Sequence, residues 1–247
     1  MGWLGLAAYL LWLVTGSPAA LDFARHAGIW FFLLPIVLTV SHRMIPFFSS
    51  RVLDNYVLVR PYWMLWLMLA CIGAHGCLQS LEMPAYLWIV DFPLAGCAFY
   101  LSYRWGFLRS FRVSLLAVLH VSFAWLGIAM TLYAVQSLVY LLSGSMLLGL
   151  APLHALAIGY FASMVLAMAS RVTLGHSGRP LELDHITWIL FLSFQAAAVL
   201  RILADIVPMI APMLYVAAGL AWLGCFVFWA AKYAPIYWRQ RVDGKPG

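Results

Sequence analysis

The sequence predicts an all-α integral membrane protein, a polytopic helical bundle of about eight transmembrane helices with both termini in the cytoplasm. Apolar residues make up 66% of the 247-residue chain and charged residues only 9%. Soluble domains typically carry about 25% charged residues, so a water-soluble fold could not cover its surface with the charges present here. The 12 Trp and 12 Tyr residues also suit a membrane protein, because both rings favour the bilayer–water interface.

We expect residues 1–247 to form one transmembrane bundle, because the apolar runs approach the ~20 residues needed to cross the hydrocarbon core. The stretch 136–147 is too short to span, and we expect an interfacial turn broken at Ser143–Gly144. The first run is short, and its sequence leaves open whether it crosses. The expected spans are 3–15, 25–46, 61–81, 84–104, 112–135, 148–172, 186–206 and 209–232.

Basic residues predict the orientation of these spans. They follow the second, fourth, sixth and eighth expected spans, whereas the turns after the third, fifth and seventh contain no Lys or Arg. Only Arg25, after the first span, departs from the alternation. The positive-inside rule therefore places both termini in the cytoplasm. The net charge of +6 does not indicate nucleic acid as a partner, because the basic residues lie in short loops; the lipid bilayer is the expected partner.

Histidines inside the expected spans are candidate functional residues, because ionisable groups are costly in a bilayer. His120 and His154 each share a helix face with small residues, and His75 shares a stripe with Gln79 and Glu82. Neutral imidazole is a common ligand for haem iron and copper, so these histidines predict a metal site in the bundle. The alternative is that each histidine only bonds two helices together. That alternative is stronger for His75, with Gln79 and Glu82 as expected partners.

The loop after the sixth expected span is the densest polar stretch of the chain. It places His176 between Arg171 and Arg179, with two glycines and a proline that favour a tight turn. The two arginines could hold anionic groups such as haem propionates. The alternative is a cytoplasmic loop that follows the positive-inside rule. A similar cluster, containing His42 and Arg43, closes the second span.

Several ordered motifs resemble the signature of the NnrS family, and the resemblance covers nearly the whole chain. It implies a haem- and copper-associated protein of the bacterial inner membrane, involved in nitric oxide metabolism, nitrosative stress tolerance and denitrification. It also implies metal ligation by His120, His154 and His176, and cofactor binding by Arg43, Arg171 and Arg179. The motifs are Arg43–Phe48, Leu119–Trp125, Leu153–Gly159, Met168–Leu181, Tyr233–Pro235 and Asp243–Gly247.

The chain departs from the family pattern at its beginning. Typical members carry more spans, with a Trp–His–Ala–His–Glu stretch in an N-terminal half that has no counterpart here. The resemblance therefore implies that the chain corresponds to the C-terminal part of the family's fold. The chain would then be a fragment, a natural short form, or one part of a fold whose missing N-terminal half comes from a partner subunit and completes the metal site.

Three functions follow as hypotheses. The first is a haem- and copper-associated bundle that binds, senses or turns over nitric oxide; whether it is an enzyme stays open, since no nucleophile–base pair or phosphate loop is evident. The second is a proton-coupled transporter, in which the histidines, Glu82 and Arg201 line a path. Against it, the chain lacks an evident inverted repeat. The third is a structural or assembly subunit whose polar residues only join helices.

Overall fold

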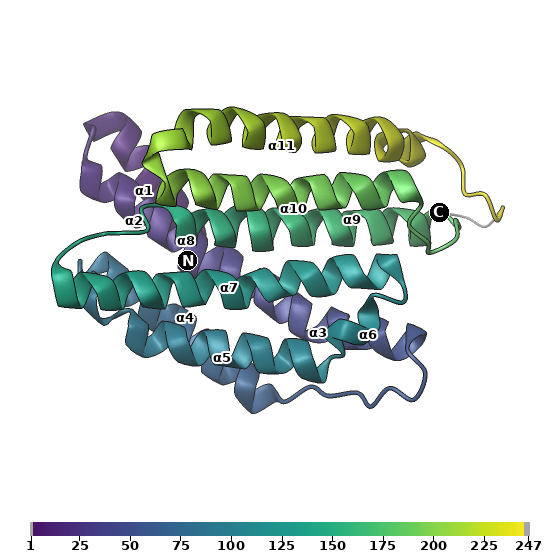
Figure 1. Ribbon diagram of the computed structural model, residues 1–247, viewed down its shortest axis with the longest axis horizontal. Helices are drawn as coiled ribbons and strands as arrows, with labels where there is room; N and C mark the ends of the chain where they lie inside the picture. The colour runs from purple at the N-terminus through teal and green to yellow at the C-terminus, as the bar shows by residue number, and fades with distance from the viewer. Residues whose placement is uncertain (1, 245–247) are drawn as a thin grey trace.

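The computed structural model describes residues 2–244, and every regular element in that range is helical (Figure 1). Six helical segments are long and apolar enough to cross a membrane: Pro18–Val52, Tyr62–Ser80, Ser114–Ser143, Ala151–His176, His185–Ile206 and Pro208–Trp238. The predicted all-helical, polytopic membrane fold is thus confirmed. The lipid bilayer is the environment that such apolar segments require.

The segments divide into α-helices with short 3-10 or π-helical insertions. The α-helices are α1 (Gly2–Thr15), α2 (Pro18–Gly28), α3 (Leu34–Val52), α4 (Tyr62–Ser80), α5 (Trp88–Arg104), α6 (Phe107–Ser110), α7 (Ser114–Ser143), α8 (Ala151–His154), α9 (Ser163–His176), α10 (His185–Ile206) and α11 (Ala211–Tyr233). The π segments are η1 (Ile29–Leu33) and η3 (Ala155–Ala162), and the 3-10 segments are η2 (Pro84–Tyr86), η4 (Pro208–Ile210) and η5 (Ala234–Trp238).

Two of the eight expected spans are shorter in the structure than a membrane crossing requires. The expected span 3–15 is α1, with 14 residues, and most of 84–104 is α5, with 17; about 20 are typical of a crossing. The count of eight spans therefore stays a prediction. The turn expected over 136–147 is instead helical as far as Ser143, where Gly144 ends α7 in the left-handed conformation (φ 68°).

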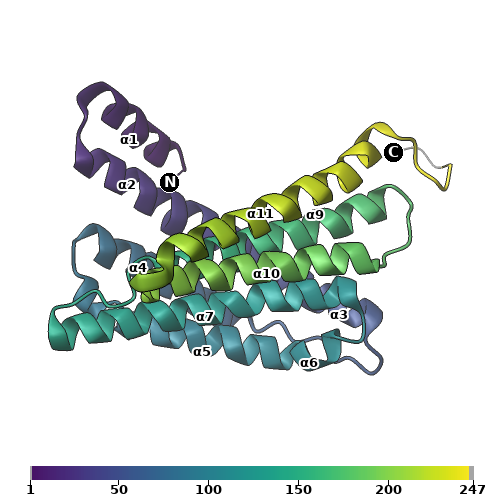
Figure 2. The same cartoon turned by 45° about the horizontal axis from the view of Figure 1, so that its top comes forward.

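Helix α1 folds back along the beginning of the long helical segment formed by α2, η1 and α3. Gly5 of α1 lies against Ala27, and Gly2 lies against the ring of Phe32. The small residues allow this close antiparallel approach, and the resulting hairpin leans out from the rest of the bundle (Figure 2). The start of α1 thus lies beside the middle of the neighbouring segment.

The centre of the bundle is α7. In its most apolar stretch 72% of the residues are buried, against 17% in the peripheral segment Pro208–Trp238. It packs against α5 on one side and against η3 and α9 on the other (Figures 1 and 2). Apolar side chains are spread around α7 rather than confined to one face, as expected of a helix with neighbours on several faces.

The last two long helices, α10 and α11, pack side by side and are joined by a polar contact at the end of the bundle near the C-terminus (Figure 1). Asp184 caps α10 by accepting a hydrogen bond from the Thr187 backbone N–H at 2.9 Å, and it forms an ion pair with Lys232 of α11. Partial burial opposes ionisation of Asp184, but the hydrogen bonds from Lys232 and Thr187 lower its pKa to about 2. Asp184 is therefore ionised at neutral pH.

A close contact between Trp125 and Gly159 joins three of the inner segments. A Cβ added at Gly159 would lie 2.5 Å from Cδ2 of the Trp125 ring. The same ring donates a hydrogen bond from Nε1 to Oε1 of Gln195 (2.7 Å), whose Nε2 donates to Oγ of Ser163 (2.9 Å). The indole thus bonds α7 to α10 and lies directly on the backbone of η3.

We expect Gly159→Ala to destabilise the protein by about 1–3 kcal/mol, because the added methyl group overpacks the contact with the Trp125 ring. Thermal unfolding in detergent, followed by circular dichroism, measures the effect. The matched control is Gly96→Ala in α5, where nothing lies within 4 Å of the added Cβ. An equal loss of stability in both variants would contradict the close-packing explanation.

Candidate functional site

One fully buried and one partly buried histidine–aspartate pair lie toward one end of the bundle. The opposite end carries the arginine-rich loops, around residues 51–60, 104–112 and 171–179. In the first, Nδ1 of His75 in α4 lies 2.7 Å from Oδ1 of Asp91 in α5, and both side chains are 0% exposed. In the second, Nδ1 of His154 in α8 lies 2.5 Å from Oδ2 of Asp205 in α10, with side chains 15% and 8% exposed. Each pair bonds two helices across the bundle.

The sequence patterns did not predict the carboxylate partners of His75 and His154. The expected partners of His75 are wrong: Glu82 is exposed, and the backbone there is left-handed (φ 55°), while Oε1 of Gln79 has no hydrogen-bond partner within residues 2–244. The available signal was an acidic residue inside an otherwise apolar run. Asp91 and Asp205 both satisfy that condition, and ionisable residues in such runs are rarely without a partner.

The first pair is enclosed by aromatic rings. Trp30, in the π segment η1, stacks on the His75 ring with centroids 3.6 Å apart, and Tyr133 of α7 meets the same ring edge-on at 5.0 Å. Among the described residues, Nε2 of His75 and Oδ2 of Asp91 have no hydrogen-bond partner. The imidazole therefore keeps one ring nitrogen uncommitted inside a closed apolar environment.

The second pair is more accessible and is part of a larger polar cluster. Tyr215 of α11 lies on the other side of the carboxylate, with its hydroxyl 3.5 Å from Oδ1 of Asp205. The Arg201 guanidinium lies 4.1 Å from the centroid of the Tyr215 ring. A cavity of about 400 Å³ adjoins this cluster, with walls that include Ile158, Arg201, Tyr215 and Trp222.

The arrangement around His154 is the one that metal-binding histidines use. A carboxylate that accepts the Nδ1–H fixes the tautomer and leaves the Nε2 lone pair for a metal. The π segment η3 begins at Ala155, directly after His154, and π-helical insertions occur frequently at functional sites. His75 has the same carboxylate arrangement, but its complete burial leaves no access for a large cofactor.

The other predicted ligand on α7, His120, forms a helix–helix hydrogen bond. Its Nε2 lies 3.0 Å from Oγ of Ser49 in α3, and that hydroxyl donates to the backbone oxygen of Ile45 at 2.9 Å. His120 is 1% exposed. The bond links α7 to α3, which agrees with the alternative that an intramembrane histidine only bonds two helices together.

The remaining predicted site residues lie at the opposite end. His176 is exposed at the end of α9, about 33 Å from His154 by the helical rise, so the two cannot bind one metal. Arg171 is 6% exposed, with its guanidinium 4.0 Å from the centroid of the Phe48 ring. Nη1 of Arg179 is buried without a hydrogen-bond partner in the described chain, and Arg43 is exposed.

The donor set fits haem better than it fits copper. Across residues 2–244, no group of three or more His, Cys, Asp or Glu side chains is placed to hold a metal ion. A copper site built from several protein ligands would therefore need ligands from outside this set. Haem iron can be held by a single proximal histidine, and His154 with Asp205 meets that requirement.

The fold and the buried pairs define a polytopic helical membrane protein with histidine–carboxylate pairs inside its bundle. A family model described as NnrS protein matches residues 1–241, so the chain belongs to the NnrS family. Membership associates it with the nitric oxide response at the level of the family. No curated protein and no solved structure matches the chain significantly. The family resemblance found in the sequence motifs is thus confirmed.

We expect the His75–Asp91 pair to show strong energetic coupling in a double-mutant cycle. Removing one partner leaves the other buried and unpaired, which costs about 3–5 kcal/mol in proteins. His75→Phe and Asp91→Leu should therefore each destabilise the protein, while the double variant should lose much less than the sum. Unfolding in detergent provides the free energies.

The surface pair Arg25–Asp22, with side chains 62% and 57% exposed, is the control for this cycle. Alanine substitutions there should give a coupling of about 0–1 kcal/mol. Additive effects of His75→Phe and Asp91→Leu would show that the buried contact contributes no specific stability.

Proposed function

We propose that the protein is a haem-associated protein of the bacterial inner membrane that acts in the nitric oxide response, and that His154 would hold the haem iron. The observation that carries the proposal is the contact of 2.5 Å between Nδ1 of His154 and Oδ2 of Asp205. That contact directs the lone pair of Nε2 away from the carboxylate. Family membership supports the association with nitric oxide.

The neighbouring residues have distinct roles in this proposal. Asp205 fixes the tautomer and the orientation of the His154 ring. Arg201, which has no carboxylate partner in the described chain, offers a cation for a propionate. Ile158 and Trp222 supply apolar walls of the adjoining cavity. The bound haem would supply the iron that coordinates nitric oxide.

The other predicted cofactor residues suit a separate centre. Arg171 follows His154 by 17 residues, or about 25 Å of helix, so Arg43, Arg171 and Arg179 cannot anchor a haem held by His154. His176 lies at their end of the bundle. A copper centre at that end would draw further ligands from a partner subunit.

A vestibule near the first pair favours proton-coupled transport as a second candidate function. A cavity of about 370 Å³ is lined by polar residues that include Gln79, Glu82 and Gln136, together with Tyr133. The Tyr133 ring contacts His75, so this side chain separates the vestibule from the buried pair. A histidine–carboxylate pair beside a polar opening is typical of proton relays in transporters.

Metal-free protein in liposomes provides the test of transport. If the pair relays protons, the wild-type protein should conduct them across the vesicle membrane, and Asp91→Asn should abolish the flux. Asp22→Asn, on the exposed surface, should conduct like the wild type. Absence of flux from correctly inserted wild-type protein would remove this function.

The visible spectrum of the detergent-purified, haem-replete protein tests the haem proposal. A Soret band should be present in the wild type and lost in His154→Ala. Asp205→Asn should weaken haem binding about 10–100-fold, as loss of a partner to a metal-binding histidine does. His120→Ala and His176→Ala, measured in parallel, test the other two predicted ligands.

His185→Ala is the control, because His185 is exposed at the start of α10. Its Soret band should match that of the wild type. An unchanged Soret band in a folded His154→Ala variant would refute the ligand assignment. A colourless wild-type protein without bound metal would refute the haem proposal itself.

A further inference from the structure

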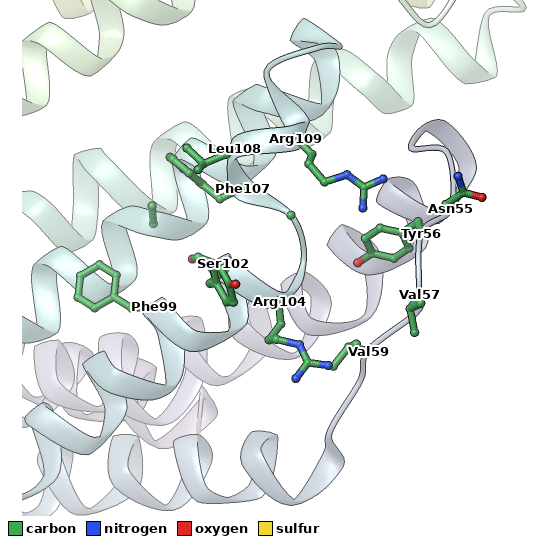
Figure 3. Close-up of a pocket in the computed structure, with 13 residues that line it drawn as sticks. Asn55, Tyr56, Val57, Val59, Phe99, Ser102, Arg104, Phe107, Leu108 and Arg109 are labelled. Carbon is green, nitrogen blue, oxygen red and sulfur yellow. The ribbon is translucent and has the colours of Figure 1, made fainter.

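A further cavity lies away from the histidine–aspartate pairs, near the end of the bundle that carries the arginine-rich loops. Its volume is about 650 Å³ (Figure 3). The loop between α3 and α4 forms one wall, and the end of α5 with the start of α6 forms the other. Gly106, between these two helices, has a φ of 88°, which a residue with a side chain rarely adopts.

The polar groups that line this cavity are mainly hydrogen-bond donors. Arg104 and Arg109 contribute two guanidinium groups, and in the view of Figure 3 the Tyr56 ring lies between them. The hydroxyl oxygen of Ser102 is buried and has no hydrogen-bond partner in the described part of the chain, and the Tyr56 hydroxyl is buried beside Ser49. Ser102 is 6% exposed. Two cations therefore line the same space.

No acidic side chain in the described part of the chain forms an ion pair with Arg104 or Arg109. The lining contains no Asp or Glu among the described residues. Arg109 donates to the backbone oxygen of Asp54, and Nη1 of Arg104 donates to the Tyr100 hydroxyl at 3.0 Å. A guanidinium group has five N–H donors, so both arginines retain donors for a further partner. The cavity is thus complementary to an anion.

The rest of the cavity is apolar. Phe99, Phe107 and Leu108 line it from the α5–α6 side, and Val57 lies on the opposite wall. Ala124 of α7 contributes a small side chain, which leaves space toward the interior of the bundle. A small hydrated anion would leave these walls uncovered, whereas an anionic amphiphile would cover the walls and pair with the arginines.

We propose that this cavity binds an anionic phospholipid of the adjacent membrane leaflet, with its phosphate at Arg104 and Arg109 and an acyl chain along Phe99 and Ala124. Basic pockets between transmembrane helices near the cytoplasmic surface are known binding sites for anionic lipid headgroups. The site is separate from His154, so it does not depend on the proposed haem.

Native mass spectrometry of the full-length, delipidated protein tests this proposal. The protein is titrated with phosphatidylglycerol, or with phosphatidylcholine of the same acyl chains. The wild type should bind phosphatidylglycerol more tightly. Arg104→Gln should weaken that binding about fivefold, since one arginine near an anionic surface contributes on this order, and should leave phosphatidylcholine binding unchanged.

Two further variants distinguish the contribution of the lipid headgroup to binding from the contributions of the acyl chain and of general surface charge. Ala124→Leu, which fills the apolar part of the cavity, should weaken binding of both lipids. Arg112→Gln is the matched control, because Arg112 is an exposed arginine of the same region that does not line the cavity. It should bind like the wild type. If Ala124→Leu fails to fold, the comparison of Arg104→Gln with Arg112→Gln decides.

Three outcomes would overturn the proposal. Equal binding of the two lipids by the wild type would show that the arginines do not select an anion. Equal losses in Arg104→Gln and Arg112→Gln would assign the preference to general surface charge. Displacement of the lipid by an equimolar amount of inorganic phosphate would identify a free anion as the ligand.

Discussion

The histidine–aspartate bonds are the interactions on which the interior of this bundle depends. An ionisable side chain inside a membrane protein is costly unless a neighbour satisfies it. His75 and Asp91 meet this condition from α4 and α5, and His154 and Asp205 meet it from α8 and α10. Each bond forms only when its two helices are aligned in one way, so the pairs fix the relative positions of neighbouring helices. Apolar packing alone would fix those positions only weakly.

The packing around the pairs agrees with this requirement. Trp30 contacts His75 from a π segment, and a second π segment follows His154 directly. In both places the helix is distorted beside a buried imidazole. Gly159 allows η3 to approach Trp125 of α7, so the segment that carries His154 is held against the central helix. Close backbone approach through glycine is a common device of membrane bundles.

Composition and periodicity were sufficient to predict the membrane bundle and the buried positions of His75 and His120, because these depend on residues near one another in sequence. The partners could not be predicted in the same way. Gln79 is one helical turn from His75, but the partner is Asp91, across a reversal of the chain. His154 and Asp205 are separated by 51 residues. Such pairings depend on the positions of whole helices, which local spacing does not determine.

The distribution of charge divides the bundle into two chemically different ends. Toward the end with the histidine pairs, the buried carboxylates are matched by imidazoles within the chain. At the other end, Arg104 and Arg171 face aromatic rings, and neither has a carboxylate partner in the described chain. Cations without internal partners favour anions supplied from outside the chain. The first end is therefore suited to hold a histidine in a fixed orientation, and the second to bind anionic groups, so the two ends can be altered separately.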